Sequence, residues 1–290
     1  MDKAVFSPRA NIRYNPTQDV NIRFSYAEGF RAPQAFDEDL HISNVGGELV
    51  SIVRAKGLKE ERSRSFNASV DWYHYFGDFQ ANLLVEGFYT KLSDPFVLTP
   101  PVKDPDGSAY LIQTRINGSG AKVYGGTLEG KVAYKDKVQL QAGLTLQRSI
   151  YDSPEEWSAD EEHLSEKERY SDKILRTPDV YGYLQLPICV KAFSIALNGN
   201  YTGRMYVPHL LSEVNGEADV LVKSPDFFEL GTKIAYDFDF QGFCLQLNAG
   251  VQNIFNSYQK DFDKGASRDS GYIYGPGAPR SYFAGVKLSF

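Results

Sequence analysis

Apolar and polar residues alternate one by one through several segments of this chain. In VNIRFSY, at 20–26, the apolar residues occupy every second position, and Asn, Arg and Ser stand between them. A period of two is typical of a β-strand with one apolar and one polar face. The pattern returns at 79–89, 138–147, 228–238, 243–253 and 281–290. We count about twelve such segments, many near the 9–11 residues with which a tilted strand crosses a bilayer.

The connections between these segments alternate in length. Short turns are predicted at 15–19, 75–78, 135–137, 187–190 and 239–242. Long polar loops are predicted near 29–62, 94–109, 151–176, 204–225 and 254–279. Short turns on one rim and long loops on the other are typical of an outer-membrane β-barrel. The polar face is rich in Gln, Asn, Ser, Glu and Lys, which favours a wet lumen over the apolar interior of a small soluble barrel.

These patterns predict an all-β fold over residues 1–290, a single transmembrane, antiparallel, up-and-down β-barrel domain of the outer-membrane type with about twelve strands. Because lipid cannot satisfy backbone polar groups, the strands must belong to a closed sheet. In segment 20–26 we place Ile22, Phe24 and Tyr26 toward lipid and Arg23 toward the lumen. Aromatic residues near strand ends, which suit either a membrane-interface girdle or packing between strands, are Trp72, Tyr73, Tyr75, Tyr236 and Phe238.

Composition excludes several classes of function. Asp and Glu number 37 against 31 Lys and Arg, a net charge of -6 without a basic stripe, so we expect no nucleic-acid partner. Cys189 and Cys244 are too few for a disulfide scaffold and lack metal-ligand spacing. Because the motifs of nucleophile elbows, phosphate-binding loops and zinc proteases are missing, we expect no catalytic residue, no metal site and no enzyme activity. The chain shows neither an apolar leader segment nor an apolar run long enough for a membrane helix.

One acidic segment carries a helix signal. In SPEEWSADEEHLSEKERYSDK, Ser153 and Glu156 have the spacing of a capping box, and Pro154 stands at the first helical position. We therefore predict a short surface helix here. A solvated acidic face explains the charge, with cation binding as the alternative.

Five motifs, in order along the chain, resemble those of TonB-dependent outer-membrane receptors. They are FSPRANIRYNPTQDVNIRFSYAEGFRAP at 6–33, GLKEERSRSFNASVDW at 57–72, AKVYGGTLEGKVAY at 121–134, RTPDVYGYLQL at 176–186, and GVQNIFNSYQKDFD with YGPGAPRSYFAGVKLSF at 250–290. The resemblance implies that this chain corresponds to the C-terminal half of a plugged, 22-stranded barrel. Phe290 resembles the terminal signal that barrel-assembly machinery reads.

The same resemblance implies partners and a function. The partners are outer-membrane lipid, the N-terminal plug and barrel half missing from this chain, TonB acting through that plug, and the barrel-assembly machinery. The family imports a scarce nutrient, such as a ferric siderophore, haem or cobalamin. We expect no cofactor, and haem or a ferric chelate only as transported ligand. The alternative is an autonomous barrel of about twelve strands, acting as a passive pore or adhesin.

Two groups of residues are candidates for the rim and for ligand contact. The rim motif is Phe30, Arg31, Ala32 and Pro33, where we expect Arg31 to fix the loop by hydrogen bonds or an acidic partner. This motif followed by His41 is similar to the haem-receptor subgroup, and imidazole is a suitable iron ligand, so His41 is a candidate haem ligand. The NPxL box of that subgroup is replaced by AKGLKEE. Further candidates, for which loop anchoring is the alternative role, are Arg204, Tyr206 and His209.

Overall fold

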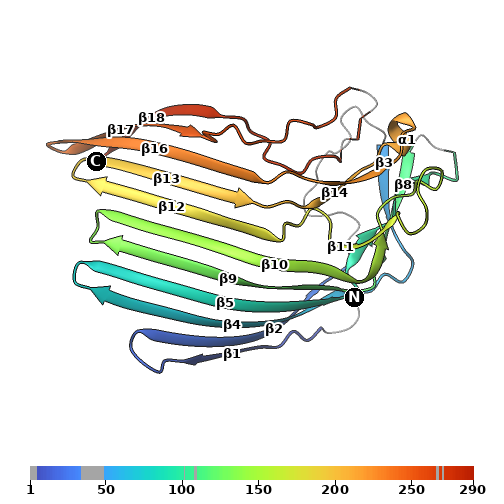
Figure 1. The fold of residues 1–290 in the computed structure, drawn as a ribbon, viewed down its shortest axis with the longest axis horizontal. Helices are drawn as coiled ribbons and strands as arrows, with labels where there is room; N and C mark the ends of the chain where they lie inside the picture. The colour runs from blue at the N-terminus through green and yellow to red at the C-terminus, as the bar shows by residue number, and fades with distance from the viewer. Residues whose placement is uncertain (1–4, 34–48, 101, 108–109, 266–267, 270) are drawn as a thin grey trace.

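The computed structural model describes residues 5–33, 49–100, 102–107, 110–265, 268–269 and 271–290. Its main feature is a sheet of twelve strands (Figure 1). β11 (Tyr170–Lys173) pairs with β10 at one end, and the other strands follow one another antiparallel. Their order is β1 (Arg9–Tyr14), β2 (Val20–Arg31), β4 (Glu61–Phe76), β5 (Phe79–Ser93), β9 (Ala121–Tyr134), β10 (Val138–Glu156), β12 (Val180–Val190), β13 (Phe193–Thr202), β16 (Phe227–Phe240), β17 (Phe243–Gln252) and β18 (Ser281–Ser289). The predicted all-β, up-and-down fold is confirmed.

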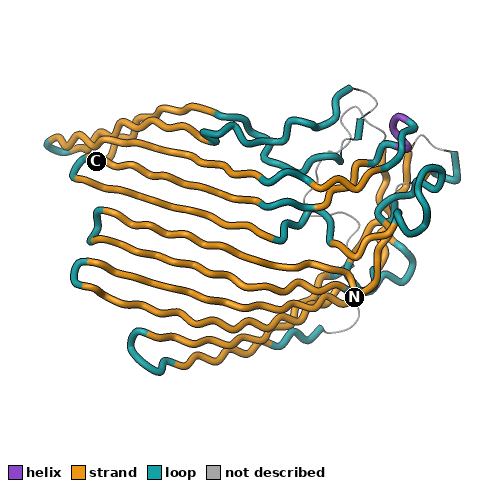
Figure 2. Tube along the Cα trace, viewed as in Figure 1, coloured by secondary structure: helices purple, strands orange, loops and turns teal. Residues whose placement is uncertain are grey.

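The sheet is open. Among the described residues, β1 pairs only with β2 and β18 pairs only with β17. Figure 2 shows the two outermost strands on opposite sides of a curved sheet. The described strands therefore form part of a barrel wall rather than a closed ring.

Turns and loops are segregated to opposite ends of the strands. The turns at 15–19, 77–78, 135–137, 191–192 and 241–242 lie at the left in Figure 2. The long connections 32–60, 94–120, 157–179, 203–226 and 253–280 start from the right end. We call these the turn rim and the loop rim.

One predicted turn, at 187–190, is wrong. These residues are the last four of β12, and the turn follows at Lys191, whose backbone is left-handed with φ 54°. Pro187, read as a turn signal, is tolerated because the β10–β12 pairing stops at Gln141–Gln185 and resumes only at Val138–Ile188. The missing N–H of proline falls in that interruption.

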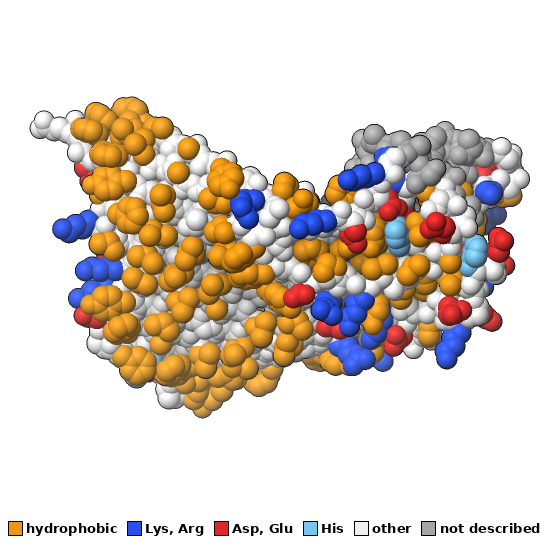
Figure 3. All heavy atoms as spheres, turned by 45° about the horizontal axis from the view of Figure 1, so that its top comes forward, with side chains coloured by type: hydrophobic (Ala, Val, Ile, Leu, Met, Phe, Trp, Pro, Cys, Tyr) orange, Lys and Arg blue, Asp and Glu red, His pale blue; other side chains and the backbone are white. Residues whose placement is uncertain are grey.

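The sheet has one apolar and one polar face. A row of exposed apolar side chains crosses neighbouring strands in register from Val70 through Val85 to Leu128 and Leu144. On the polar face side chains bond across strands, as between the hydroxyls of Thr127 and Thr145 at 2.9 Å. Figure 3 shows hydrophobic side chains over much of the sheet. Such an exposed apolar surface is the opposite of a soluble protein's exterior.

The aromatic residues near the turn rim divide between the two faces. Trp72, Tyr236 and Phe238 lie on the apolar face, as a girdle requires. Tyr73 and Tyr75 alternate onto the polar face, opposite Asn82 and Gln80, and the Tyr73 hydroxyl donates to Asp71 at 2.9 Å. Of the two alternatives, the girdle does not hold for these two tyrosines, because adjacent strand residues point to opposite sides.

The loop rim carries small structures of its own. A four-stranded sheet contains β3 (Leu49–Arg54), β6 (Phe96–Leu98), β7 (Val102–Lys103) and β8 (Tyr110–Asn117). A hairpin of β14 (Tyr206–His209) and β15 (Val220–Lys223) encloses the short helix α1 (Ser212–Asn215). Of the helices in the described part, none has the length and apolar character to cross a membrane.

The helix predicted from Ser153 and Glu156 is wrong. Both residues belong to β10, which runs past its pairing with β12 and there pairs with β11. The backbone N–H of Ser153 donates to the Ser119 hydroxyl at 3.1 Å, and Ser119 N–H donates to Glu155 at 2.7 Å. These contacts with a distant segment outweigh the local capping signal.

Candidate functional site in the long loops

A cluster of buried apolar residues lies in the loops. Met205, Val207 and Tyr272 are buried, with Val222 and Tyr274 packed against them. Val207 has no exposed surface. We call these five residues the loop cluster. It joins the β14–β15 hairpin to the 253–280 connection, so these two loops form one ordered structure.

His209 anchors the hairpin to the 253–280 connection. Its Nε2 lies 2.8 Å from Oδ2 of Asp263, and its ring stacks on Tyr272 with 3.8 Å between ring centroids. The same carboxylate oxygen accepts the N–H of Asp269 at 3.0 Å. The His209 side chain is 17% exposed. Its contacts are those of a loop anchor.

Two phenols share one carboxylate beside the loop cluster. Tyr274 donates to Asp261 at 2.6 Å, and Tyr272 donates to it at 3.2 Å. Burial raises the pKa of Tyr274 well above its ordinary value, and the hydrogen bond and charge of Asp261 raise it further. Burial likewise raises the pKa of Tyr272. Both hydroxyls therefore remain protonated donors.

Two buried aspartates connect the 157–179 and 203–226 loops. Asp219 accepts the Ser158 hydroxyl at 2.6 Å, and its own N–H donates to Asp160 at 3.0 Å. We call Asp160 and Asp219 the aspartate latch. Burial alone would raise the pKa of Asp160, but hydrogen bonds from Asp219 N–H and from His163 outweigh it and lower the pKa. Asp160 is thus ionised at neutral pH.

A polar hollow lies on the polar face beside the 253–280 connection. Its volume is about 380 Å³, and Glu229 and Lys233 of β16 line it together with Asn200 of β13. Asn253 and Ala278, from the two ends of the connection, complete it. Amide, carboxylate and ammonium groups on one wall can bind a polar solute by hydrogen bonds and charge.

The family described as TonB dependent receptor-like, beta-barrel, matches residues 1–254. The chain belongs to this family. Its members are receptors rather than enzymes. No curated protein matches the chain.

Solved receptors share the fold of this receptor barrel. The ferripyoverdine receptor of Pseudomonas aeruginosa matches with a TM-score of 0.65 and 14% identity over 99% of this chain and 33% of its own. The ferric-catecholate import receptor Fiu of E. coli K12 matches at 0.60 and 17%, over 97% and 34%. The copper transporter OprC matches at 0.61 and 14%, over 97% and 39%. The chain thus spans between a third and two fifths of these receptors.

The Asn-x-Phe-Asn motif of the receptor barrel closes its last long loop. Asn253, with a left-handed φ of 51°, donates to the Ala278 carbonyl at 2.9 Å and accepts Ser257 N–H at 2.8 Å. Asn256 accepts the N–H of Arg280 at 2.9 Å. The two asparagines therefore hold both ends of the 253–280 connection together beside the polar hollow.

The remaining predicted contact residues have separate partners. Arg204 lies 3.8 Å from Asp226 and its side chain is 62% exposed. The Nζ of Lys223 lies 5.8 Å from the ring centroid of Tyr206. The backbone carbonyl of Tyr206 accepts the N–H of Arg176 at 2.8 Å. Tyr206 and His209 thus lie on β14 and Arg204 lies two residues before it, and the three have no common partner among the described residues. Their role in ligand contact stays a prediction.

The rim motif continues the strand it follows. β2 runs through Phe30 to Arg31, which pairs with Glu61, so the strand extends past position 29, where the loop was predicted to begin. The guanidinium of Arg31 lies 5.7 Å from the ring centroid of Phe96 in β6. Ala32 and Pro33 follow the strand, and His41 lies outside the described residues.

Several residues of this site lie within a motif of the family but carry no periodicity that predicts their contacts. Asp261, Asp263 and Gln259 stand in a loop without periodicity, and only the structure shows that they meet β14 or the loop tyrosines. Gln259 donates to the Tyr272 carbonyl at 3.0 Å and accepts Tyr274 N–H at 2.8 Å. Within the described residues, no three His, Cys, Asp or Glu side chains are grouped to hold a metal ion.

Proposed function

We propose that this chain forms part of a TonB-dependent importer of the bacterial outer membrane, and that its loops and polar hollow contact a scarce nutrient carried as a metal chelate. The observation that carries the proposal is the ordered loop structure beside a polar wall. Asn253 and Ala278 belong to both, so a solute held by the loops lies next to Glu229 and Lys233.

The apolar face supports a location in the membrane. Along β4, exposed aromatic residues stand at Phe66 and Phe76. This stretch measures about 33 Å along the strand, or about 25 Å across a bilayer at the usual tilt of outer-membrane strands. That is the height of the apolar band in such barrels. The loop rim would then face the outside.

The chemistry of the hollow favours a chelate over a bare ion. Its walls offer amides, one carboxylate and one ammonium group, which suit the organic shell of a ferric siderophore, haem or cobalamin. Among the similar solved structures, the receptors for ferric catecholate and ferripyoverdine support this class, whereas OprC is a copper transporter. Haem binding by His41 remains part of the proposal. The plug, the remaining barrel wall and TonB, none of which this chain contains, would complete the importer.

The test is nutrient-dependent growth and uptake in cells that carry or lack the complete receptor. With a ferric siderophore, haem or cobalamin offered singly, we expect deletion to abolish uptake of one of them, and loss of TonB to do the same. TonB-independent passage of small solutes through the purified protein would instead support the passive pore. Loss of cell adhesion without loss of uptake would support the adhesin.

Substitutions in the hollow test the contact surface. We expect the Glu229→Gln and Lys233→Gln pair to reduce uptake of that nutrient by about tenfold, since two charged contacts are removed. Asp237→Asn is the matched control, because Asp237 lies on the same face of β16 near the turn rim, paired with Gln246 at 2.7 Å. Equal uptake by all variants would remove the hollow from the proposal.

A further inference from the structure

Three rows of side chains follow one another on the apolar face near the loop rim, each in register across neighbouring strands. The cation row, nearest the loops, contains Arg64, Lys91 and Lys122. The aromatic row contains Tyr26, Phe66, Tyr89 and Tyr124. The small row contains Ala68, Gly87 and Gly126. Adjacent rows are two residues apart along each strand, which is about 6.7 Å.

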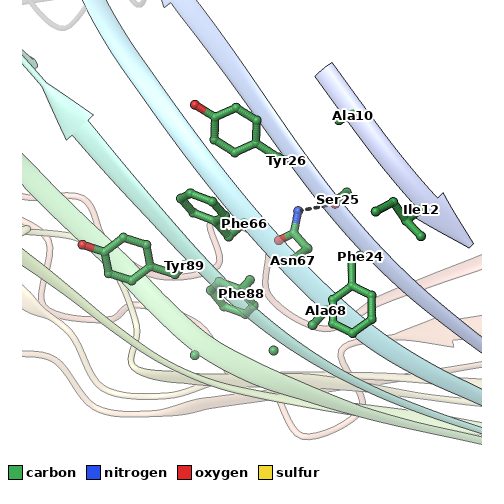
Figure 4. Close-up of a pocket in the computed structure, with 12 residues that line it drawn as sticks. Ala10, Ile12, Phe24, Ser25, Tyr26, Phe66, Asn67, Ala68, Phe88 and Tyr89 are labelled. Atoms are coloured by element: carbon green, nitrogen blue, oxygen red, sulfur yellow. Dashed lines mark hydrogen bonds between the residues drawn. The ribbon is translucent and has the colours of Figure 1, made fainter. Parts of the chain in front are cut away.

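The small row leaves an apolar hollow in the surface. Its volume is about 550 Å³. Tyr26, Phe66 and Tyr89 border it on the side of the cation row, and Figure 4 shows their rings following one another across three strands. Ile12 and Phe24 border it toward β1 and are 66% and 54% exposed. The space is thus open to the surroundings of the apolar face.

Packing within the sheet does not require a glycine at the centre of this hollow. A Cβ built on Gly87 meets no described atom closer than the Gly125 carbonyl oxygen at 4.0 Å. On the polar face, in contrast, a Cβ on Gly143 would lie 2.5 Å from the Tyr183 ring. Gly143 is therefore needed for packing, whereas Gly87 leaves room that another molecule can fill.

The cation row contains more positive side chains than there are carboxylates in contact with it. Arg64 lies 3.4 Å from Glu28, while Lys91 and Lys122 both contact Asp152, the latter at 2.9 Å. Three cations therefore share two carboxylates. Arg148 is exposed and in register with Tyr124, so it adds a fourth positive charge one row away from the cation row. Lys and Arg side chains gather between the hydrophobic surface and the loop region in Figure 3.

We propose that this part of the apolar face binds one lipid, with a phosphorylated headgroup on the cation row and an acyl chain in the apolar hollow. Guanidinium and ammonium groups are strong donors to phosphate oxygens. Tyrosine rings suit the level between headgroup and acyl chain. The acyl chain would fill the space above Gly87, where the sheet has no side chain of its own. The inference rests on the membrane location proposed above.

The test is lipid binding by the complete receptor in detergent, followed by native mass spectrometry. Phosphatidic acid is compared with the diacylglycerol that bears the same acyl chains, and with glycerol phosphate. We expect one retained phosphatidic acid and binding at least about tenfold weaker for the other two compounds. Equal binding of diacylglycerol would overturn the headgroup assignment. Full competition by glycerol phosphate would overturn the acyl assignment.

Variants separate the two parts of the site. We expect the Arg64→Gln and Lys122→Gln pair to weaken phosphatidic acid binding about tenfold, and Gly87→Leu to weaken it by filling the hollow. Lys135→Gln is the matched control, since Lys135 is also paired, with Asp78 at 2.9 Å, and packs near an aromatic ring, but lies on the turn rim. An equal loss in Lys135→Gln overturns a specific cation row. Unchanged binding by Gly87→Leu overturns the hollow.

Two further readouts keep the outcome clear. Heat-modifiable migration on a gel shows that each variant retains its barrel. Because lipid binding is measured in detergent, it does not depend on nutrient uptake. A wild-type receptor that retains the lipid but takes up none of the nutrients counts against the proposed importer alone. A wild-type receptor that takes up a nutrient but retains no lipid counts against the lipid site alone.

Discussion

The imidazole of His209 lies almost parallel to the ring of Tyr272, at an interplanar angle of 7° and with 3.8 Å between the ring centroids. The two residues come from different long loops, and Asp263 holds the imidazole from its edge at 2.8 Å. The stacked pair therefore joins the β14–β15 hairpin to the 253–280 connection over the buried Val207. His209, which the sequence predicted as a ligand contact, thus helps to determine the shape of the loops.

Removal of the imidazole should loosen these loops without unfolding the barrel. We expect His209→Ala to increase the rate of proteolysis in the 203–226 and 253–280 connections, because both the stacking and the bond to Asp263 are lost. Limited proteolysis with mass-spectrometric mapping measures this. The control is His74→Ala, which removes another His–Asp pair, 3.0 Å from Asp19, at the turn rim. Unchanged cleavage in His209→Ala would contradict the anchoring role.

The aspartate latch should make two loops sensitive to acid. The pKa of Asp160 is lowered in the fold, so its contribution to stability is fully present above the ordinary carboxyl pKa, about 3.9. It is lost as the pH falls below that value through the lowered pKa. We expect amide exchange in 157–179 and 203–226 to accelerate in this range, as hydrogen-exchange mass spectrometry would show.

Asp160→Asn tests the latch directly. The variant should show faster exchange in both loops already at neutral pH and a weaker acid effect, because the ionised acceptor is gone. Asp226→Asn serves as the control, since that carboxylate is half exposed and pairs only loosely with Arg204 at 3.8 Å. The same acid response in wild type and Asp160→Asn would assign the effect to other groups.

Glycine can adopt the backbone conformation of Asn253, which closes the last loop, but it cannot form the side-chain hydrogen bonds of Asn253. Asn253 combines a left-handed backbone with three hydrogen bonds to residues 257 and 278. We expect Asn253→Ala to lower the midpoint of thermal unfolding and to increase cleavage in 253–280. Asn253→Gly relieves the backbone strain but does not restore the side-chain hydrogen bonds. Equal behaviour of wild type and glycine variant would show that the side-chain bonds add nothing.

The sequence predicted the sheet well and the loops poorly, for physical reasons. In a strand such as β10, apolar and polar residues alternate one by one. The sequence of this strand alone therefore places Leu140 and Leu144 on the same face, without knowledge of the neighbouring strands. At Ser153 the local signal favours a helix, yet pairing with distant residues decides the structure. His209 and Asp263 are 54 residues apart with no period between them. Only motifs known from the family, such as Asn253 to Asn256, pointed to order in the loops.

A glycine on the polar face sets how closely the last strand approaches its neighbour. A Cβ built on Gly250 would lie 2.3 Å from the Phe283 ring of β18 and 2.4 Å from the Thr232 carbonyl oxygen of β16. We therefore expect Gly250→Ala to displace β18 or β16 and to destabilise the barrel, in the range of about 1–3 kcal/mol known for overpacking. The midpoint of heat-modifiable migration measures the loss. Gly130→Ala, where a Cβ meets no described atom within 4 Å, is the matched control and should leave that midpoint unchanged. An equal shift in both variants would reflect the general effect of alanine in a strand, and the close approach of Phe283 would then have no special role.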